Sequence, residues 1–93
     1  MPARIVVDAS LPGRVAAGLA AAGFEIVEGG RADLAVVSLP ELLRLRAGRT
    51  AVRTVVVADD VVAAFDAGAD DVVSPRIDPS ELAARIHAIL RRV

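Results

Sequence analysis

The 93-residue sequence contains no cysteine, no tryptophan and no tyrosine, and it has one histidine and two phenylalanines. The absence of cysteine excludes a disulfide framework and a thiolate metal site, and one imidazole does not make a zinc site. Lysine, asparagine and glutamine are also missing, so four serines, two threonines and the histidine are the uncharged polar side chains. We predict from this poor set of groups that the protein is not an enzyme and has no metal and no cofactor.

Long apolar runs are missing as well. The longest stretch without a charged residue is Val15–Phe24, which has ten residues, about half of the ~20 that a membrane-spanning helix needs. Near the start, only three apolar residues separate Arg4 from Asp8, which is too few for a signal peptide. We therefore expect a cytoplasmic protein with no membrane partner.

Neither sign of charge is in excess. The chain has 11 arginines against 12 acidic residues, for a net charge of −1, and this balance argues against direct nucleic-acid binding. The charges nevertheless form one basic and one acidic cluster in the sequence: Arg44, Arg46, Arg49 and Arg53, then Asp59, Asp60, Asp66, Asp70 and Asp71. No aromatic stacking pattern accompanies them, and opposed clusters of this kind suit contacts between proteins.

Small apolar residues dominate what is present. Apolar residues make up 55% of the chain, with 19 alanines and 15 valines, so one domain over residues 1–93 with a core of small side chains is expected. Five apolar runs predict strands: Arg4–Val7, Phe24–Val27, Leu34–Val37, Val52–Ala58 and Asp71–Ser74. Segments of helical periodicity lie between and after them: Leu11–Ala22, Pro40–Ala47, Asp59–Ala67 and Pro79–Val93. Apolar strands separated by helices predict an α/β fold with a parallel sheet covered on both faces.

The predicted helices carry recognisable ends. Ser10 is placed to cap the first helix, Ser38 the second, and Asp78 the last, where Pro79 and Glu81 follow at favourable positions. In the helix over residues 59–67, we expect Val62 and Phe65 to face inward. Phe65→Ala is then expected to cost about 3–5 kcal/mol of stability.

One link is too short for the pattern. Only Glu28–Ala32 separates the second and third predicted strands, whereas a parallel crossover normally needs ~10–12 residues or more. Either the link is a stretched loop without a helix, or the Gly29-Gly30 pair turns an antiparallel hairpin. We favour the stretched loop.

Several segments resemble one known family. Ala67–Asp71 (AGADD) and Asp78–Leu82 (DPSEL) match the turn and the last-helix start of CheY-like response-regulator receiver domains, and Val62–Arg92 as a whole is similar to the end of such a domain. The segments RIVVD and ADLAVVSLP resemble the first and third strands of the family. The resemblance implies a flavodoxin/CheY-like doubly wound sheet of five parallel strands in the order 2-1-3-4-5, here without the helix between strands two and three.

The family's phosphorylation residues are mostly replaced. A receiver has two acids after its first strand that hold a magnesium ion; Asp8 matches the first, but Ala9 stands in place of the second. The aspartate that accepts the phosphoryl group ends the third strand, where this chain has Ser38. A serine needs a base to become a nucleophile, and Ser38 with Glu41 fits a capping box instead. We predict that Ser38 is a degenerate acceptor position and Asp8 a remnant acid.

The other three family positions are replaced too. The hydroxyl residue that ends the fourth strand becomes Val57 or Ala58, the lysine becomes Pro75 beside Arg76, and the switch aromatic of the fifth strand becomes Val72. Shortened loops trim the same edge of the sheet, where doubly wound folds bind ligands. Both observations indicate that the phosphorylation site has been dismantled.

A dimer surface is implied by the resemblance to receivers of the winged-helix type. It would combine the helix over 59–67, the strand over 71–74 and the last helix, and we assign it five charged residues: Asp70, Asp71, Glu81, Arg85 and Arg92. Glu81, Arg85 and Arg92 share one helix face, with Glu81 and Arg85 in the order that favours an ion pair. Since a two-fold interface needs both signs on one surface, we expect a weak homodimer; the alternative is a charged face that only keeps the domain soluble. Of Val61 and Val62, at least one should be exposed in an apolar patch.

Two functions follow as hypotheses. The first is a phosphorylation-independent receiver-like module for protein interaction or dimerisation in a bacterial signal-transduction or transcription regulator, with an output domain or another protein as a possible partner. The second is a small-ligand sensor that uses the crevice around Asp8, Ser38, Val57 and Arg76.

Overall fold

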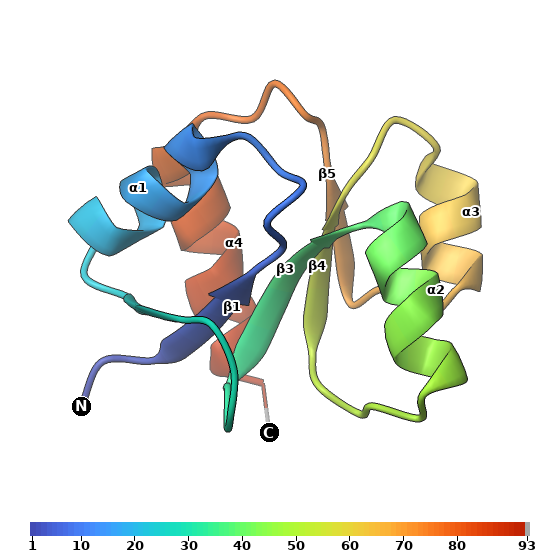
Figure 1. The fold of residues 1–93 in the computed structure, drawn as a ribbon. Coiled ribbons are helices and arrows are strands. Elements are labelled where there is room, and N and C mark those ends of the chain that lie inside the picture. The colour runs from blue at the N-terminus through green and yellow to red at the C-terminus, as the bar shows by residue number, and fades with distance from the viewer. Residues whose placement is uncertain (93) are drawn as a thin grey trace.

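The computed structural model describes residues 1–92, which form a parallel sheet between two layers of helices (Figure 1). The strands are β1 (Arg4–Val7), β2 (Glu25–Val27), β3 (Leu34–Ser38), β4 (Thr54–Val57) and β5 (Asp71–Val73). The helices are α1 (Gly13–Ala21), α2 (Leu39–Ala47), α3 (Val61–Asp66) and α4 (Pro79–Leu90). All neighbouring strands pair in parallel, in the order β2-β1-β3-β4-β5. The predicted α/β fold class and strand order are confirmed.

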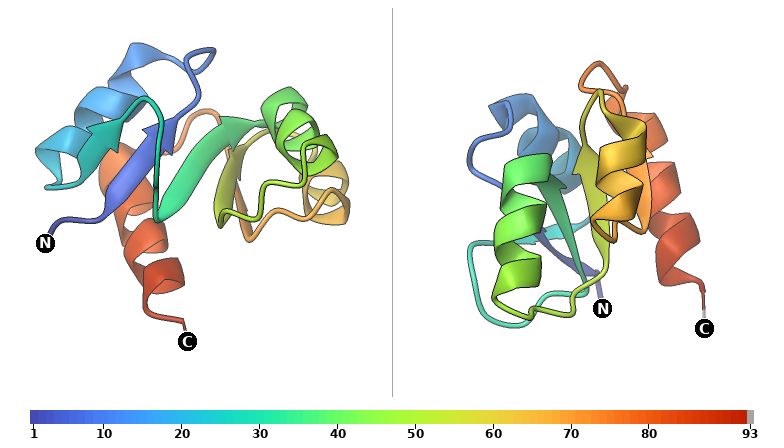
Figure 2. Two further views of the ribbon diagram at one scale, coloured as in Figure 1. Left: turned by 60° about the horizontal axis from the view of Figure 1, so that its bottom comes forward. Right: turned by 90° about the vertical axis from the view of Figure 1, so that its right-hand side faces the viewer.

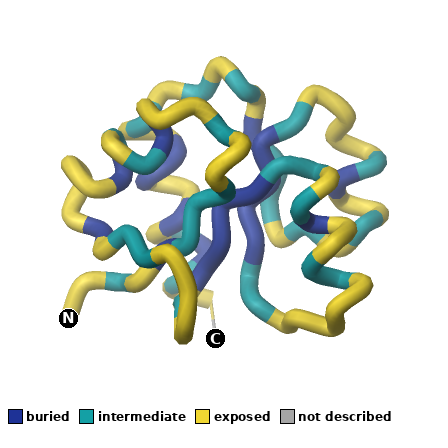
Figure 3. The backbone as a smooth tube through the Cα atoms, viewed as in Figure 1, coloured by how far each residue is buried: buried dark blue, intermediate teal, exposed yellow. Residues whose placement is uncertain are grey.

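The two faces of the sheet are covered unequally. Helices α1 and α4 lie on one face and α2 and α3 on the other (Figure 2). Because side chains alternate along a strand, Val36 and Val55 join the larger core under α1 and α4, whereas Ala35, Val37 and Val56 join the smaller core under α2 and α3. The central strands are buried on both sides (Figure 3).

The link between β2 and β3 contains no helix. The chain crosses from one strand to the other as an extended loop, with Gly30 at φ +74°, and the two strands run parallel rather than as a hairpin. Asp33 fixes the far end of the loop, since its carboxylate accepts from the Arg4 N–H at 2.8 Å. The favoured stretched loop is therefore confirmed. The consequence is that α2 and α3 alone cover their face of the sheet.

Helix ends confirm two of the three predicted caps. The Ser38 Oγ accepts from the Glu41 N–H at 3.3 Å, and the Asp78 carboxylate accepts from the Ser80 N–H at 2.8 Å. The prediction for Ser10 is wrong: α1 begins after Pro12 without a side-chain cap, and Ser10 lies two residues before this N-cap position, where its N–H donates to the Asp8 carboxylate at 2.9 Å. The predicted last helix extends to Val93, which lies outside the described residues. No helix within residues 1–92 has the length and apolarity needed to span a bilayer.

The orientation predicted for α3 is wrong. Ala64 is the buried residue of this helix, whereas Val62 is 70% exposed and Phe65 48% exposed. Successive helix residues are turned by about 100°, so a helix that places Ala64 against the sheet cannot also bury Phe65. The small alanine lets α3 approach the sheet closely, and the larger side chains point to solvent. Phe65→Ala is accordingly no longer expected to cost the 3–5 kcal/mol of a buried aromatic.

Candidate functional site at the carboxyl edge of the sheet

Asp8 and Ser38 lie together where β1 and β3 end. The Asp8 carboxylate accepts from the Ser38 hydroxyl at 2.6 Å and from the Ser38 N–H at 3.0 Å. Its other oxygen accepts from the Ser10 N–H. The parallel pairing of β1 with β3 brings these residues together although they are thirty positions apart in the sequence. Asp8 and Ser38, which were expected to line one crevice, are thus in direct contact.

These contacts hold Asp8 in its ionised form. Burial alone would raise its pKa, but the hydrogen bonds from the Ser38 hydroxyl and from the Ser10 and Ser38 N–H groups outweigh burial and lower the pKa to about 2. A carboxyl group with a lowered pKa stabilises the fold above its ordinary value of 3.8. That contribution is lost as the pH falls from about 4 towards 2, where the carboxylate takes up a proton.

The residues at this edge do not fit the magnesium ion that the family's chemistry implies. Mg²⁺ prefers near-octahedral oxygen ligands and is usually held by more than one group, whereas Ala9 offers no side-chain oxygen and Asp8 already accepts three hydrogen bonds. No cluster of three metal-ligating side chains occurs in the part of the chain that the structure describes. The Ser38 hydroxyl donates to Asp8 and accepts from the Glu41 N–H, so it serves as a helix cap.

The other residues of the predicted crevice are placed elsewhere. Val57 is the sheet neighbour of Ser38, but its side chain belongs to the core under α1 and α4. Arg76 pairs with Asp59 at 3.2 Å on the exposed edge. The loop that contains Arg76 is bound from α1, because the Arg14 guanidinium donates to the Pro75 carbonyl at 2.6 Å. The structure thus brings together Asp8 and Ser38 and leaves Val57 and Arg76 out of their site.

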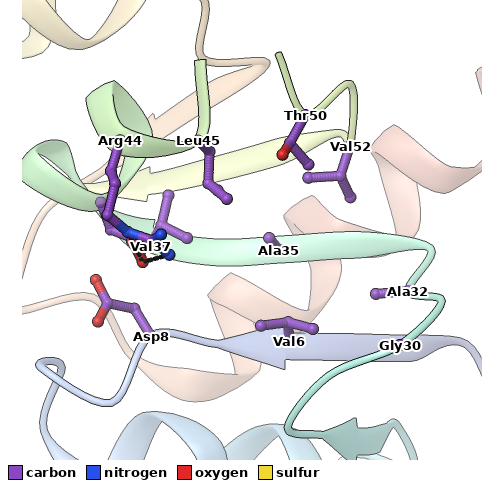
Figure 4. A pocket seen from close by; sticks show the side chains of 11 residues that line it. Val6, Asp8, Gly30, Ala32, Ala35, Val37, Arg44, Leu45, Thr50 and Val52 are labelled. Carbon is purple, nitrogen blue, oxygen red and sulfur yellow. Dashed lines mark hydrogen bonds and ion pairs between the residues drawn. The ribbon is translucent and has the colours of Figure 1, made fainter. Parts of the chain in front are cut away.

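A pocket on the α2 side of Asp8 takes the place of that crevice (Figure 4). Its volume is about 240 Å³. The lining comes from β1, β3, α2 and the two loops before β3 and β4: Val6, Asp8, Gly30, Ala32, Ala35, Val37, Glu41, Arg44, Leu45, Thr50 and Val52. Sequence reasoning missed this pocket and the roles of Glu41 and Arg44. The signal available was the short Glu28–Ala32 link, because a missing helix leaves part of a sheet face uncovered.

The predicted interface residues fall into two groups. Asp71, Glu81 and Arg85 form one charged cluster within the chain, with Arg85 3.2 Å from each of the two carboxylates. These bonds raise the pKa of Arg85, and the Asp71 hydrogen bond is the largest cause. Asp70 instead accepts from the Thr54 N–H at 2.8 Å, and the Arg92 side chain is exposed. The intrahelical pair of Glu81 with Arg85 is confirmed.

The basic cluster of the sequence is not a basic surface patch. Arg44 forms an ion pair with Glu41, one helical turn away. Arg46 and Arg53 point back to main-chain carbonyl groups, and Arg53 donates to the Ile89 carbonyl at 2.9 Å and the Arg92 carbonyl at 3.1 Å. Arg44, Arg46 and Arg53 thus use their donors within the chain, and Arg49 is exposed. The clustering in the sequence did not reveal this difference.

Comparison with solved structures identifies the fold. HP1043, an orphan response regulator of H. pylori, is similar with a TM-score of 0.70 at 26% identity over 96% of this chain and 97% of that one. The beryllofluoride-activated receiver domain of DrrB, a Thermotoga maritima protein, is similar with a TM-score of 0.76 at 20% identity over 99% and 100% of the two chains. TadZ, a CheY-like protein of Pseudomonas aeruginosa, gives a TM-score of 0.67 at 22% identity over 100% and 97%. No protein-family model and no curated protein sequence matches this chain.

The similarity to receiver domains covers nearly the whole chain and agrees with the strand order. The chain therefore has the CheY-like receiver fold. The resemblance recognised in its sequence motifs is confirmed at the level of the fold.

Proposed function

We propose that this chain is a phosphorylation-independent receiver-type interaction module of a bacterial signal-transduction protein. The similarity to response-regulator receivers supports a signalling module. The hydrogen bonds of Ser38 support independence from phosphorylation, because its hydroxyl is occupied by Asp8 and the Glu41 N–H. A second copy of the chain is the partner we favour, and an output domain or a different protein is the alternative.

The loop between β5 and α4 gives further support. The Arg14 guanidinium ties this loop to α1 by donating to the Pro75 carbonyl at 2.6 Å, and Arg76 pairs with Asp59 on its exposed side. The Ser74 carbonyl also accepts from the Ile77 N–H at 3.0 Å, which closes a turn within the loop. The module would then present one constant surface to its partner.

Treatment with acetyl phosphate and Mg²⁺ is expected to leave the protein unmodified. Ser38 lacks a carboxylate nucleophile and Ala9 lacks the second acid, so neither the acceptor nor the ion site is provided. Intact-mass spectrometry should show no added phosphate, and beryllofluoride with Mg²⁺ should leave the amide NMR spectrum unchanged. An added phosphate that disappears in Ser38→Ala would contradict the proposal.

The observation that carries the interaction proposal is an exposed apolar surface on α3. Three large apolar side chains of this helix are exposed: Val61 to 50%, Val62 to 70% and Phe65 to 48%. Exposed apolar residues usually occur singly on a protein surface, whereas these three share one short helix. Helix α3 packs against β5, which carries Asp71 of the charged cluster. We name these three side chains the α3 patch. An apolar centre beside a charged rim is the usual composition of a protein interface.

Phe65→Ser is expected to weaken self-association at least about tenfold, because the α3 patch would supply most of the apolar contact. Sedimentation equilibrium across micromolar to millimolar concentrations measures the effect. Thermal stability should fall by no more than about 1 kcal/mol, since the side chain is half exposed.

Leu43→Ser is the matched control for this experiment. Leu43 is 54% exposed and lies on α2, so its replacement by serine removes a similar apolar area outside the α3 patch. It should leave association unchanged. A protein that stays monomeric at millimolar concentration, or equal effects of the two variants, would refute self-association through α3.

A further inference from the structure

The pocket of Figure 4 lies where the sheet face lacks its third helix. On this face of the sheet, α2 borders the pocket on one side, and only the loop before β3 borders it on the other (Figure 2). Val6, Ala35, Leu45 and Val52 make its walls apolar. Its 240 Å³ corresponds to roughly eight water-sized volumes at ~30 Å³ each. That space suits a small molecule and is too small for a docked helix.

Charged groups are confined to one end of the pocket. Figure 4 shows Asp8 and Arg44 at this end, with the apolar walls extending away from them. Arg44 and Glu41 neutralise each other in a two-point ion pair. The net charge of this end is −1, because Asp8 lies beside the Glu41–Arg44 pair and its own hydrogen-bond donors are uncharged.

Asp8 can still accept a further hydrogen bond. A carboxylate has about four acceptor positions, and three are filled by the Ser10 and Ser38 donors. The remaining position lies on the oxygen that faces Ser10, next to the Ser10 hydroxyl, which also helps to lower the pKa of Asp8. A ligand ammonium group would take this position in competition with that hydroxyl. Because the pKa of this carboxyl is lowered to about 2, it stays ionised at neutral pH.

We propose that this pocket binds a small organic ammonium compound, with the ammonium group on Asp8 and a branched apolar group against Val6, Ala35 and Val52. This goes beyond the interaction function, since nothing in that function requires a ligand. The pocket's volume suits a ligand of about eight heavy atoms, in keeping with the estimate above. An anionic ligand is disfavoured because the three charged groups at the pocket's end sum to −1.

The loop on the open side of the pocket can adjust to such a ligand. Gly30 and Ala32 of this loop line the pocket. Within the described chain, residues 28–32 make no hydrogen bond to any other residue. Movement of this loop costs no hydrogen bond, so it can close over a bound apolar group.

The test is an amide NMR titration of the full chain at pH 7 with 3-methylbutylamine, 3-methylbutan-1-ol and 4-methylpentanoate. These probes share a branched apolar group and differ in charge. The amine is expected to give saturable shifts at Val6, Ala35 and Ala32, with a dissociation constant at least about tenfold below that of the alcohol. The carboxylate should not bind. Equal binding of amine and alcohol, or shifts confined to residues outside the pocket, would overturn the proposal.

Three variants separate the ammonium contact from a general effect of charge. Asp8→Asn should remove the preference for the amine over the alcohol. Asp66→Asn, a matched loss of an exposed carboxylate outside the pocket, should preserve it. Ala35→Leu should fill the pocket and abolish binding of both probes, so it tests the site independently if Asp8→Asn does not fold. A folded Ala35→Leu protein that still binds the amine would refute the assignment, as would an amine that fails to saturate the wild type.

Discussion

Arg46→Met is expected to lower the free energy of unfolding by about 2 kcal/mol, a large share of the ~5–15 kcal/mol typical of a domain. The guanidinium of Arg46 donates to the Thr50 carbonyl and to the Gly68 carbonyl at 3.0 Å each. It also reaches the Val52 carbonyl at 3.5 Å and the buried Thr54 hydroxyl at 3.3 Å. One side chain thus joins the loop before β4 to the turn before β5. Methionine keeps the apolar stem and removes every one of these donors.

Arg49→Met is the control for this prediction. Arg49 has the same charge and lies three residues further on, but it is exposed, and its side chain makes no hydrogen bond or ion pair within residues 1–92. It is expected to change stability by less than about 0.5 kcal/mol. Urea unfolding followed by circular dichroism measures both. Equal midpoints for the two variants would show that the Arg46 hydrogen bonds contribute nothing to the fold.

The fold was predictable because its signals are local. Each apolar run that became a strand is bounded by a turn residue or a helix cap, and Ser38 and Asp78 cap the helices that follow them as expected. The short link before β3 admitted two topologies, and the parallel one is realised. The predicted fourth strand began too early, since Val52 and Arg53 precede β4. Apolar character alone does not mark where strand pairing begins.

The orientation of side chains was less predictable because it depends on contacts distant in sequence. Phe65 has the size of a core residue, yet the sheet accepts Ala64 in its place, and no periodicity within six helical residues decides between them. Arg46 and Arg53 were indistinguishable from surface arginines until their carbonyl partners were brought close by the fold. Asp8 and Ser38 were expected to line one crevice because the carboxyl ends of parallel strands meet at one edge of a sheet, but the hydrogen bond between them was not predicted. The pocket beside Asp8 was not predicted, because it lies where the chain lacks a helix between β2 and β3.

Gly18→Ala is expected to destabilise the protein by about 1–2 kcal/mol, although alanine favours a helix by about 1 kcal/mol over glycine. Gly18 lies where α1 crosses α4. A Cβ atom at this position would be 2.5 Å from the Pro79 Cβ and 2.9 Å from its Cγ. The proline ring is rigid and stands at the first turn of α4, so α1 and α4 must move apart. The cost of separating them exceeds the gain in helix propensity.

Gly13→Ala provides a control with the opposite expected sign. Gly13 begins the same helix, and a Cβ atom there meets nothing within 4 Å, so alanine should stabilise the protein by up to about 1 kcal/mol. Separation of the helices in Gly18→Ala should also shift the amide NMR signals of Glu81 and Arg85, which follow Pro79 on α4 and bear the charged cluster. Gly13→Ala should leave those signals in place. If both variants raise the melting temperature, α1 and α4 are not in close contact at Gly18, and the position of the charged cluster does not depend on their packing.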